Sequence, residues 1–168
     1  CFNEKQWIGN GLLIPAGPLR ESLSALNRAN CVVINGKKNI SIESKILEKN
    51  KLIKIFYIKY KPKNIDEFIN KKFISFAGIG NPDNFFDLLK ENNINILQHI
   101  SFPDNYNYSE KKLENLEKMA KENNATLLTT EKDYLRIKEN FRKNIRYLKI
   151  EVEIENEDQF TKMIKKFI

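Results

Sequence analysis

The sequence predicts an α/β protein built on parallel strands. Short runs rich in isoleucine, valine and phenylalanine alternate along the chain with segments whose apolar residues recur at helical spacing. Glycine, proline and asparagine separate these segments. Such alternation implies parallel strands joined by right-handed crossover connections. With 168 residues, 41% of them hydrophobic, the chain is long enough for one ordinary domain or for two small units.

The first element is a rigid loop from Gly9 to Glu21, which reads Gly-Asn-Gly-Leu-Leu-Ile-Pro-Ala-Gly-Pro-Leu-Arg-Glu. The full chain has six glycines and five prolines, and this loop holds an unusual share of both. Since glycine permits positive φ angles and proline fixes φ near about −65°, such a segment holds a defined path. Composition alone favours a surface connection that caps the helix after it.

Regular elements are expected from this loop onward. They are a short helix at 21–27, a strand at 31–35 ended by Gly36, a β-rich stretch at 51–61, a strand at 72–76, and a helix that begins at Pro82 with Asn81 as its N-cap. The stretch 51–61 has apolar residues on both faces, which predicts a strand covered on two sides. The buried face of the helix is predicted to hold Phe85, Phe86, Leu88 and Leu89.

The strand–helix pattern then repeats. We expect a strand at 94–100, a helix capped by Ser109 with Leu113, Leu116, Met119 and Ala120 on one side, a strand at 125–128, and a helix that opens on a capping box at 130–133. The end of the chain differs. Residues 145–154 are β-like, and a final helix presents an apolar face of Phe160, Met163, Ile164, Phe167 and Ile168.

Loops at the carboxyl ends of parallel strands are where such proteins bind ligands. Three loops are predicted to lie there, at 77–81, 102–108 and 129–133. Taken singly, Gly78 and Gly80 are typical of a tight turn, and Thr130 and Asp133 are typical of a helix cap. Taken together, the three loops predict a site at one edge of the sheet.

Composition excludes several kinds of protein. The net charge is +7, but both signs are interspersed, which favours a solvated surface over one that binds an anionic membrane or a phosphorylated lipid. The sequence has no cluster of arginine and aromatic residues of the kind that predicts nucleic-acid binding. Cys1 and Cys31 suit a reducing compartment, and with His99 as the single histidine no metal site is expected. No apolar run approaches the roughly 20 residues that cross a bilayer.

Four segments, taken together, resemble the signature of the tetraacyldisaccharide 4′-kinases, the lipid A kinases of Gram-negative bacteria. The first is the Gly9–Glu21 loop. The others are Phe76-Ala77-Gly78-Ile79-Gly80-Asn81-Pro82 followed by Phe85-Phe86, then Phe102-Pro103-Asp104 in part, and Thr129-Thr130-Glu131-Lys132-Asp133. They stand in the family's order, and one such motif alone would carry little weight. The resemblance covers the chain from about Gly9 to about Asp133.

This resemblance implies the C-terminal portion of a parallel-sheet, P-loop-kinase-like architecture, with a smaller α/β domain joined by a two-stranded hinge. Residues 1–50 would complete the nucleotide-binding domain. The strands at 51–61 and 145–154 would be the hinge, 72–140 the smaller domain, and 157–168 a helix that returns to the first domain.

The resemblance also implies transfer of the ATP γ-phosphate to the 4′-hydroxyl of tetraacyldisaccharide 1-phosphate, with ATP and Mg²⁺ as cofactors. The sequence has no Gly-x-x-x-x-Gly-Lys-Ser/Thr loop and opens on Cys1. We therefore expect a C-terminal half, inactive by itself, with both cofactors bound mainly by the other half. The full protein is expected to be a peripheral monomer at the cytoplasmic face of the inner membrane, with an acylated disaccharide lipid as its partner.

By the same resemblance, Arg20 and Glu21 are expected nearest the sugar hydroxyl or the nucleotide. Asn10 would add a polar contact, and Lys132 would bind substrate. The alternative is that Arg20 and Glu21 form a surface ion pair of little energetic value beside a capping amide.

Asp104 and Asn105 are the expected catalytic residues. Family members typically carry a histidine after Phe-Pro-Asp, whereas this chain has Asn105, which does not titrate near neutral pH but can hold a carboxylate by hydrogen bonds. His99, within a predicted strand, is interpreted as structural. The departure at Asn105 leaves an alternative open, namely a non-catalytic nucleotide-binding or protein-binding α/β module derived from the same scaffold.

Overall fold

The computed structural model describes residues 1–167 and divides into two compact units. Unit 1 comprises Cys1–Lys61 with residues 151–167, and unit 2 comprises Pro62–Ile150. The chain therefore passes between the units twice. The assignment of 51–61 and 145–154 as a hinge stays a prediction.

Unit 1 is built on a sheet with the strand order β1-β2-β3-β8. Its elements are β1 (Phe2–Asn3), η1 (Leu23–Arg28), β2 (Cys31–Asn35), α1 (Ile40–Lys49), β3 (Lys54–Pro62), β8 (Ile150–Ile154) and α6 (Glu157–Ile164). β1, β2 and β3 run parallel, and Val32 of β2 pairs with Ile55 of β3. The backbone N–H of Glu155 donates to the Tyr57 carbonyl at 2.9 Å, next to β8.

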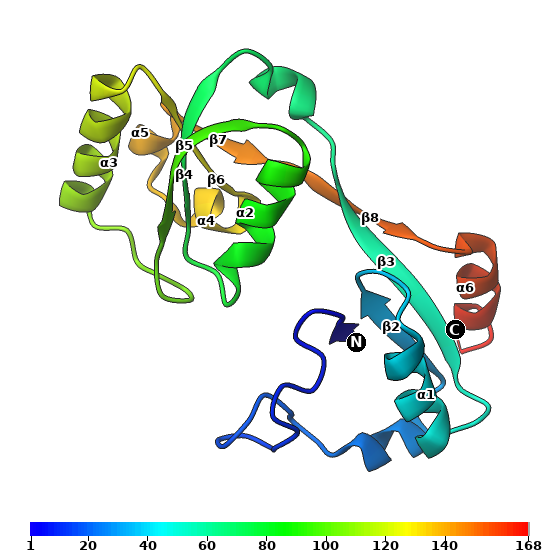
Figure 1. The fold of residues 1–168 in the computed structure, drawn as a ribbon. Helices are drawn as coiled ribbons and strands as arrows, with labels where there is room; N and C mark the ends of the chain where they lie inside the picture. The colour runs from blue at the N-terminus through cyan, green and yellow to red at the C-terminus, as the bar shows by residue number, and fades with distance from the viewer. Residues whose placement is uncertain (168) are drawn as a thin grey trace. The chain divides into compact units, whose positions relative to one another are not determined.

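The β3 strand is covered on both faces, as the sequence predicts (Figure 1). Tyr57 packs with Ile42 and Ile46 of α1 in one apolar cluster. Phe56 points to the opposite face, where its ring meets Phe160 of α6 edge-on at 5.1 Å. Continuous apolar character in a strand is the expected result of burial on both sides.

Unit 2 is a four-stranded parallel sheet with the order β5-β4-β6-β7. Its elements are η2 (Ile65–Phe68), β4 (Lys72–Ala77), α2 (Pro82–Glu91), β5 (Asn95–Ser101), α3 (Glu110–Glu122), β6 (Thr126–Thr130), α4 (Glu131–Arg136), α5 (Glu139–Arg142) and β7 (Ile145–Leu148). This arrangement confirms the predicted alternation of parallel strands and helices.

Helices cover both faces of the unit 2 sheet (Figure 1). Phe73 and Ala77 of β4 pack with Phe85, Phe86 and Leu89 of α2. The alternate β4 residues Ile74 and Phe76 pack with Leu113, Leu116 and Ala120 of α3. Because successive strand side chains point to opposite faces, one short strand supports both cores.

Local capping signals were reliable in part. The Ser109 hydroxyl accepts a hydrogen bond from the Lys112 N–H at 3.3 Å and caps α3. Pro82 is the first residue of α2, but the Asn81 side chain makes no capping hydrogen bond there. Leu23–Arg28 is a 3₁₀ helix, whereas the expected helix lay at 21–27. The α1 helix, capped by Asn39, was not predicted.

The β-like stretch 145–154 is two strands in two sheets. β7 closes the edge of the unit 2 sheet, and β8 belongs to the unit 1 sheet. Buried Asn64 marks the break, because it donates to the Tyr147 carbonyl at 3.1 Å and accepts from the Lys149 N–H at 2.9 Å. The β-like character predicted for 145–154 is confirmed, and the structure divides the stretch into two strands on either side of Lys149.

The final helix α6 presents only part of its predicted apolar face to the core. Met163 is buried, whereas Phe167, beyond the helix, is 60% exposed. Ile168, the last member of that face, lies outside the described residues. Within residues 1–167, no helix is both long and apolar enough to cross a membrane.

Candidate functional site

Three loops of unit 2 meet at the carboxyl ends of adjacent strands. Gly78 follows β4, Asn105 lies in the loop after β5, and Asp133 stands in α4 directly after β6. The Asn105 N–H donates to the Gly78 carbonyl at 3.0 Å, and the Gly78 N–H donates to Asp133 Oδ2 at 2.9 Å. The convergence predicted from strand–helix alternation is therefore confirmed by direct contacts.

Asp133 is a fully buried carboxylate at the centre of this cluster. Its Oδ2 accepts from the Gly78 N–H and, at 2.8 Å, from the Thr130 hydroxyl. The Thr130 hydroxyl in turn accepts from the Asp133 N–H at 3.1 Å and caps α4. The capping-box prediction is thus half correct, because the carboxylate turns to Gly78 across the sheet edge.

Arg136 joins all three loops. Its Nη1 donates to the Gly78 carbonyl at 3.3 Å and stands 3.5 Å from Asp133 Oδ1, while its Nη2 donates to Asn105 Oδ1. The Arg136 side chain is 28% exposed, so the ion pair with Asp133 is largely shielded. A buried carboxylate requires such a partner, since an unpaired buried charge costs several kcal/mol.

The predicted site residues Asp104, Asn105 and Lys132 all lie at the same sheet edge. Lys132 Nζ stands 3.7 Å from Asp104 Oδ1, and both side chains are about half exposed. Asn105 is exposed and has a left-handed backbone with φ of +58°. The structure therefore brings the loop after β5 next to the start of α4. These two segments contain the 102–104 and 129–133 motifs.

Aromatic side chains pack within the loop after β5 and against strand β4. The rings of Phe102 and Tyr106 stack at 4.6 Å, and Tyr108 meets Phe76 of β4 edge-on at 5.4 Å. Burial raises the pKa of the Tyr108 phenol far above its usual range, and the Asp133 charge raises it further. The phenol accordingly stays protonated at physiological pH.

Gly78 allows the loops to approach one another. A Cβ at this position would stand 2.9 Å from Tyr108 Oη, 3.0 Å from Tyr106 Cβ and 3.2 Å from Asp133 Oδ1. Any side chain would therefore push apart the groups that meet at the site. This close approach explains why the motif has a glycine at position 78.

The glycine-rich loop of unit 1 is braced from within. Asn10 Nδ2 donates to the Ala16 carbonyl at 2.8 Å, and Asn10 Oδ1 accepts from the Leu12 N–H at 3.1 Å. Gly17 packs against the same amide, because a Cβ there would stand 2.2 Å from Asn10 Oδ1. The Ile14–Pro15 bond is cis. Asn10 thus uses both ends of its amide to hold the loop.

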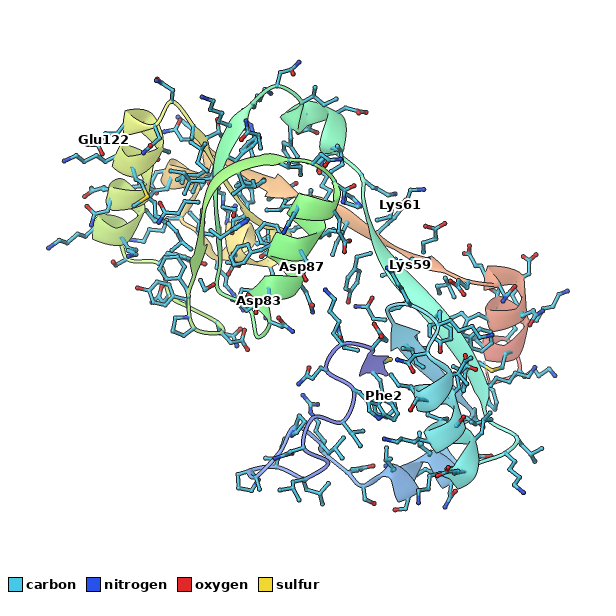
Figure 2. All side chains as sticks on the ribbon, in the orientation of Figure 1. Phe2, Lys59, Lys61, Asp83, Asp87 and Glu122 are labelled. Atoms are coloured by element: carbon cyan, nitrogen blue, oxygen red, sulfur yellow. The ribbon has the colours of Figure 1, made fainter. Side chains whose placement is uncertain are left out.

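Arg20 and Glu21 line a cavity of about 730 Å³ within unit 1. Phe2 and Trp7 line the same cavity, and their rings lie 4.7 Å apart (Figure 2 labels Phe2). Glu21 pairs with Arg28 of η1. The alternative of a surface ion pair between Arg20 and Glu21 does not hold, because η1 places the Arg28 guanidinium beside the Glu21 carboxylate. The predicted contact of Arg20 and Glu21 with substrate stays a prediction.

Sequence reasoning missed Arg136. The motif ends at Asp133, and nothing in the pattern singles out the arginine that follows. Its spacing was a usable signal, since residues three apart on a helix lie on one face and an Asp–Arg pair stabilises the helix. Its contact with Asn105, 31 residues away in sequence, depends on the sheet and could not be read from spacing.

His99 lies outside the cluster, on edge strand β5. Its Nδ1 is 2.6 Å from the hydroxyl of buried Ser75, and its ring lies 4.5 Å from Phe86. Burial lowers the pKa of His99 from its usual 6.5. Among residues 1–167, no three His, Cys, Asp or Glu side chains gather as a metal site.

Comparison with known proteins gives consistent matches over the chain. A model of the tetraacyldisaccharide-1-P 4′-kinase family matches residues 1–168. The tetraacyldisaccharide 4′-kinase of Pelagibacter ubique is 44% identical over 170 residues, which cover 98% of this chain and 54% of that protein. That of Rickettsia bellii is 44% identical over 137 residues, covering 80% of this chain and 41% of the relative.

A solved structure agrees. LpxK from Aquifex aeolicus, crystallised in complex with ATP, matches with a TM-score of 0.64 and 26% identity, over 98% of this chain and 50% of that one. This match confirms the predicted parallel-sheet, P-loop-kinase-like architecture. The chain spans about half the length of the curated relatives it matches. Because the family model matches residues 1–168, the chain belongs to the tetraacyldisaccharide-1-P 4′-kinase family.

Proposed function

We propose that the full-length protein transfers the γ-phosphate of ATP to the 4′-hydroxyl of tetraacyldisaccharide 1-phosphate in lipid A biosynthesis. The family match over the whole chain is the observation that carries this proposal. It is supported by the site at the carboxyl edge of the unit 2 sheet, where two motif segments and the loop after β5 meet. This chain would contribute positioning groups to that reaction.

Phosphoryl transfer depends on positioning and on charge neutralisation more than on covalent chemistry by the protein. We assign Asp104 and Asn105 to the reacting centre, because their loop reaches the sheet edge and both side chains face solvent. Lys132, held 3.7 Å from Asp104, would contact an anionic group of the substrate and orient the Asp104 carboxylate.

We assign Arg20 and Glu21 to substrate contact through the cavity that they line in unit 1. Arg20 is exposed, and its guanidinium suits a phosphate or sugar oxygen. Asn10 is assigned an indirect role, because both of its polar atoms hold the loop that leads to Arg20. Its predicted direct contact with substrate remains part of the proposal, because the second N–H of Nδ2 and the second lone pair of Oδ1 are left for it.

The residues of this chain do not fit a Mg²⁺ or triphosphate site by themselves. Mg²⁺ takes carboxylates and phosphate oxygens in octahedral geometry, and no acidic cluster of that kind occurs in residues 1–167. The sequence also has no phosphate loop. We therefore place ATP and Mg²⁺ mainly on parts of the full-length protein that this chain does not contain.

The substrate class sets the proposed location and partner. A tetraacylated disaccharide resides in a membrane, so we propose that the protein works peripherally at the cytoplasmic face of the inner membrane. The proposed active form is a monomer.

The test is a kinase assay of the full-length protein with Mg-ATP and tetraacyldisaccharide 1-phosphate in mixed micelles. Formation of the 4′-phosphorylated product is expected, and the 168-residue chain alone should form none. A full-length protein that binds nucleotide or a protein partner without product would overturn the kinase and favour the non-catalytic module. Arg142→Ala serves as a control, because Arg142, in α5, donates to the backbone carbonyls of Leu135 in α4 and of Ile137 just after it, and packs over Tyr134.

A further inference from the structure

We propose that Arg136 is a positioning residue that fixes the Asn105 carboxamide as a hydrogen-bond donor toward an anionic oxygen in the kinase site. The proposal rests on the proposed function and adds to it the chemistry of one contact. The anionic oxygen belongs either to a phosphoryl group or to a carboxylate.

The partner decides which way the Asn105 amide points. An arginine guanidinium has five N–H donors and no acceptor, so the amide atom that faces Arg136 Nη2 must be the oxygen. The two N–H groups of Nδ2 consequently point away from Arg136. Within residues 1–167 they meet no acceptor, and the Asn105 side chain is exposed. Asn105 therefore presents its two N–H donors to a ligand, while its oxygen already accepts a hydrogen bond from Arg136.

The guanidinium is itself held in place. Nη1 is tied to the Gly78 carbonyl at 3.3 Å and lies 3.5 Å from Asp133 Oδ1, while only 28% of the side chain is exposed. The Asp133 carboxylate is fixed in turn by the Gly78 N–H and the Thr130 hydroxyl. A planar guanidinium whose Nη1 already has two partners has little freedom to rotate, so the contact from its Nη2 to Asn105 has a defined direction.

The backbone at Asn105 adds a second constraint. Its φ of +58° lies in the left-handed region, where asparagine is several-fold enriched, and its N–H donates to the Gly78 carbonyl at 3.0 Å. An alanine at this position would carry backbone strain that has nothing to do with the amide. Glycine accepts the same φ freely, so Asn105→Gly removes the side chain without that strain.

These contacts give the pair a function that does not depend on proton transfer. Neither a guanidinium nor a carboxamide acts as an acid or a base near neutral pH. A neutral donor polarised by an adjacent cation binds an anionic oxygen more strongly than a free amide does. The rate contributed by this pair should therefore show no pH dependence near neutrality.

The first test replaces groups one at a time in the full-length protein. Asn105→Gly should lower kcat about tenfold or more. Asn105→Asp keeps an oxygen for Arg136 but turns an acceptor outward, so it should be at least as slow as Asn105→Gly. An Asn105→Asp enzyme as fast as wild type would overturn the donor assignment.

The second test is a double-mutant cycle. If Arg136 acts through Asn105, Arg136→Ala should lower kcat in the wild-type background and change it less than about twofold in the Asn105→Gly background. Arg136→Lys separates this role from folding, because one ammonium keeps the charge beside Asp133 but has no fork to reach Asn105. Arg136→Lys should therefore have a melting temperature close to that of the wild type, unlike Arg136→Ala, while its kcat stays low. Additive losses in the cycle, or full kcat in Arg136→Lys, would overturn the positioning role.

Two sources of the anionic oxygen are distinguished by the affinity for Mg-ATP. If the oxygen belongs to the nucleotide phosphates, Asn105→Gly should weaken Mg-ATP binding by calorimetry along with kcat. If it belongs to a carboxylate of the protein, kcat should fall with the Mg-ATP Kd unchanged. Arg142→Ala is the matched control and should leave both kcat and Kd within about twofold of wild type.

A measurement without turnover keeps the inference independent of the kinase assay. In ¹⁵N-labelled full-length protein, the Asn105 side-chain NH₂ signals, assigned by their loss in Asn105→Gly, should be shifted from those of a free asparagine. Arg136→Lys and Arg136→Ala should move them to free-asparagine positions, whereas Arg142→Ala should not. If the wild type forms no product, the proposed function fails, and unchanged Asn105 signals in both Arg136 variants would separately refute the positioned amide.

Discussion

Substituting Gly78 by alanine should destabilise the protein, because three loops approach one another at this glycine. The added Cβ would stand 2.9 Å from Tyr108 Oη and 3.0 Å from Tyr106 Cβ. Neither ring can move aside cheaply, since Tyr108 is 6% exposed and packs against Phe76 and Phe102. The collision also presses on Asp133 Oδ1, at 3.2 Å.

Two opposing effects set the magnitude. Replacing glycine by alanine stabilises by about 0.4–1 kcal/mol through the unfolded chain where the backbone allows it. Overpacking a tight site costs about 1–3 kcal/mol, so the net loss should be about 1–2 kcal/mol. For a domain of about 150–250 residues, that corresponds to a melting temperature lower by about 2–8 °C, and the shift is smaller where a longer chain unfolds as one unit.

Thermal and urea unfolding of the full-length variants measure this loss. Gly80→Ala is the matched control two residues along the same loop, because its Cβ would meet Asp104 Oδ2 at an ordinary 3.6 Å. It should be neutral or slightly stabilising. Adding Tyr108→Phe to Gly78→Ala removes the oxygen at 2.9 Å and should recover part of the loss. A Gly78→Ala protein as stable as Gly80→Ala would refute the close-approach argument.

Three further predictions concern the two loops and the histidine. Arg20→Ala should lower kcat/KM by tens to several hundred fold, about 2–4 kcal/mol of barrier, at unchanged melting temperature. A loss of less than about threefold would leave Arg20 as part of the scaffold only. Gly17→Ala should lower both stability and kcat, because its Cβ would collide with Asn10 Oδ1 at 2.2 Å and with the Leu12 carbonyl at 2.3 Å, and an unchanged melt would contradict this. Since burial lowers the pKa of His99 below 6.5, the unfolded chain binds the proton more readily, so the stability contributed by neutral His99 is present above pH 6.5 and falls as the pH drops below it. His99→Gln should flatten that part of the melting-temperature profile between pH 5 and 8, and identical profiles would exclude His99 as the cause.

The sequence by itself determined what depends on neighbouring residues. The strands predicted at 31–35 and 72–76, the proline start of α2 and the Ser109 cap of α3 follow from periodicity and from hydrogen bonds that span a few residues. The motifs also identified the family, because four short segments in a fixed order rarely match by chance. The convergence of three loops at the carboxyl edge of the unit 2 sheet followed from strand–helix alternation alone.

Only the tertiary structure decided which side chains of the candidate site contact one another. Asp133 was readable as a helix cap, yet its carboxylate binds Gly78, 55 residues away, and Arg136 binds Asn105, 31 residues away. Such partners depend on which strands are neighbours in the sheet, and local pattern does not encode strand order. The same holds where β7 and β8 separate into two sheets at Asn64, because a run of β-type residues records each strand's burial and not the sheet that receives it.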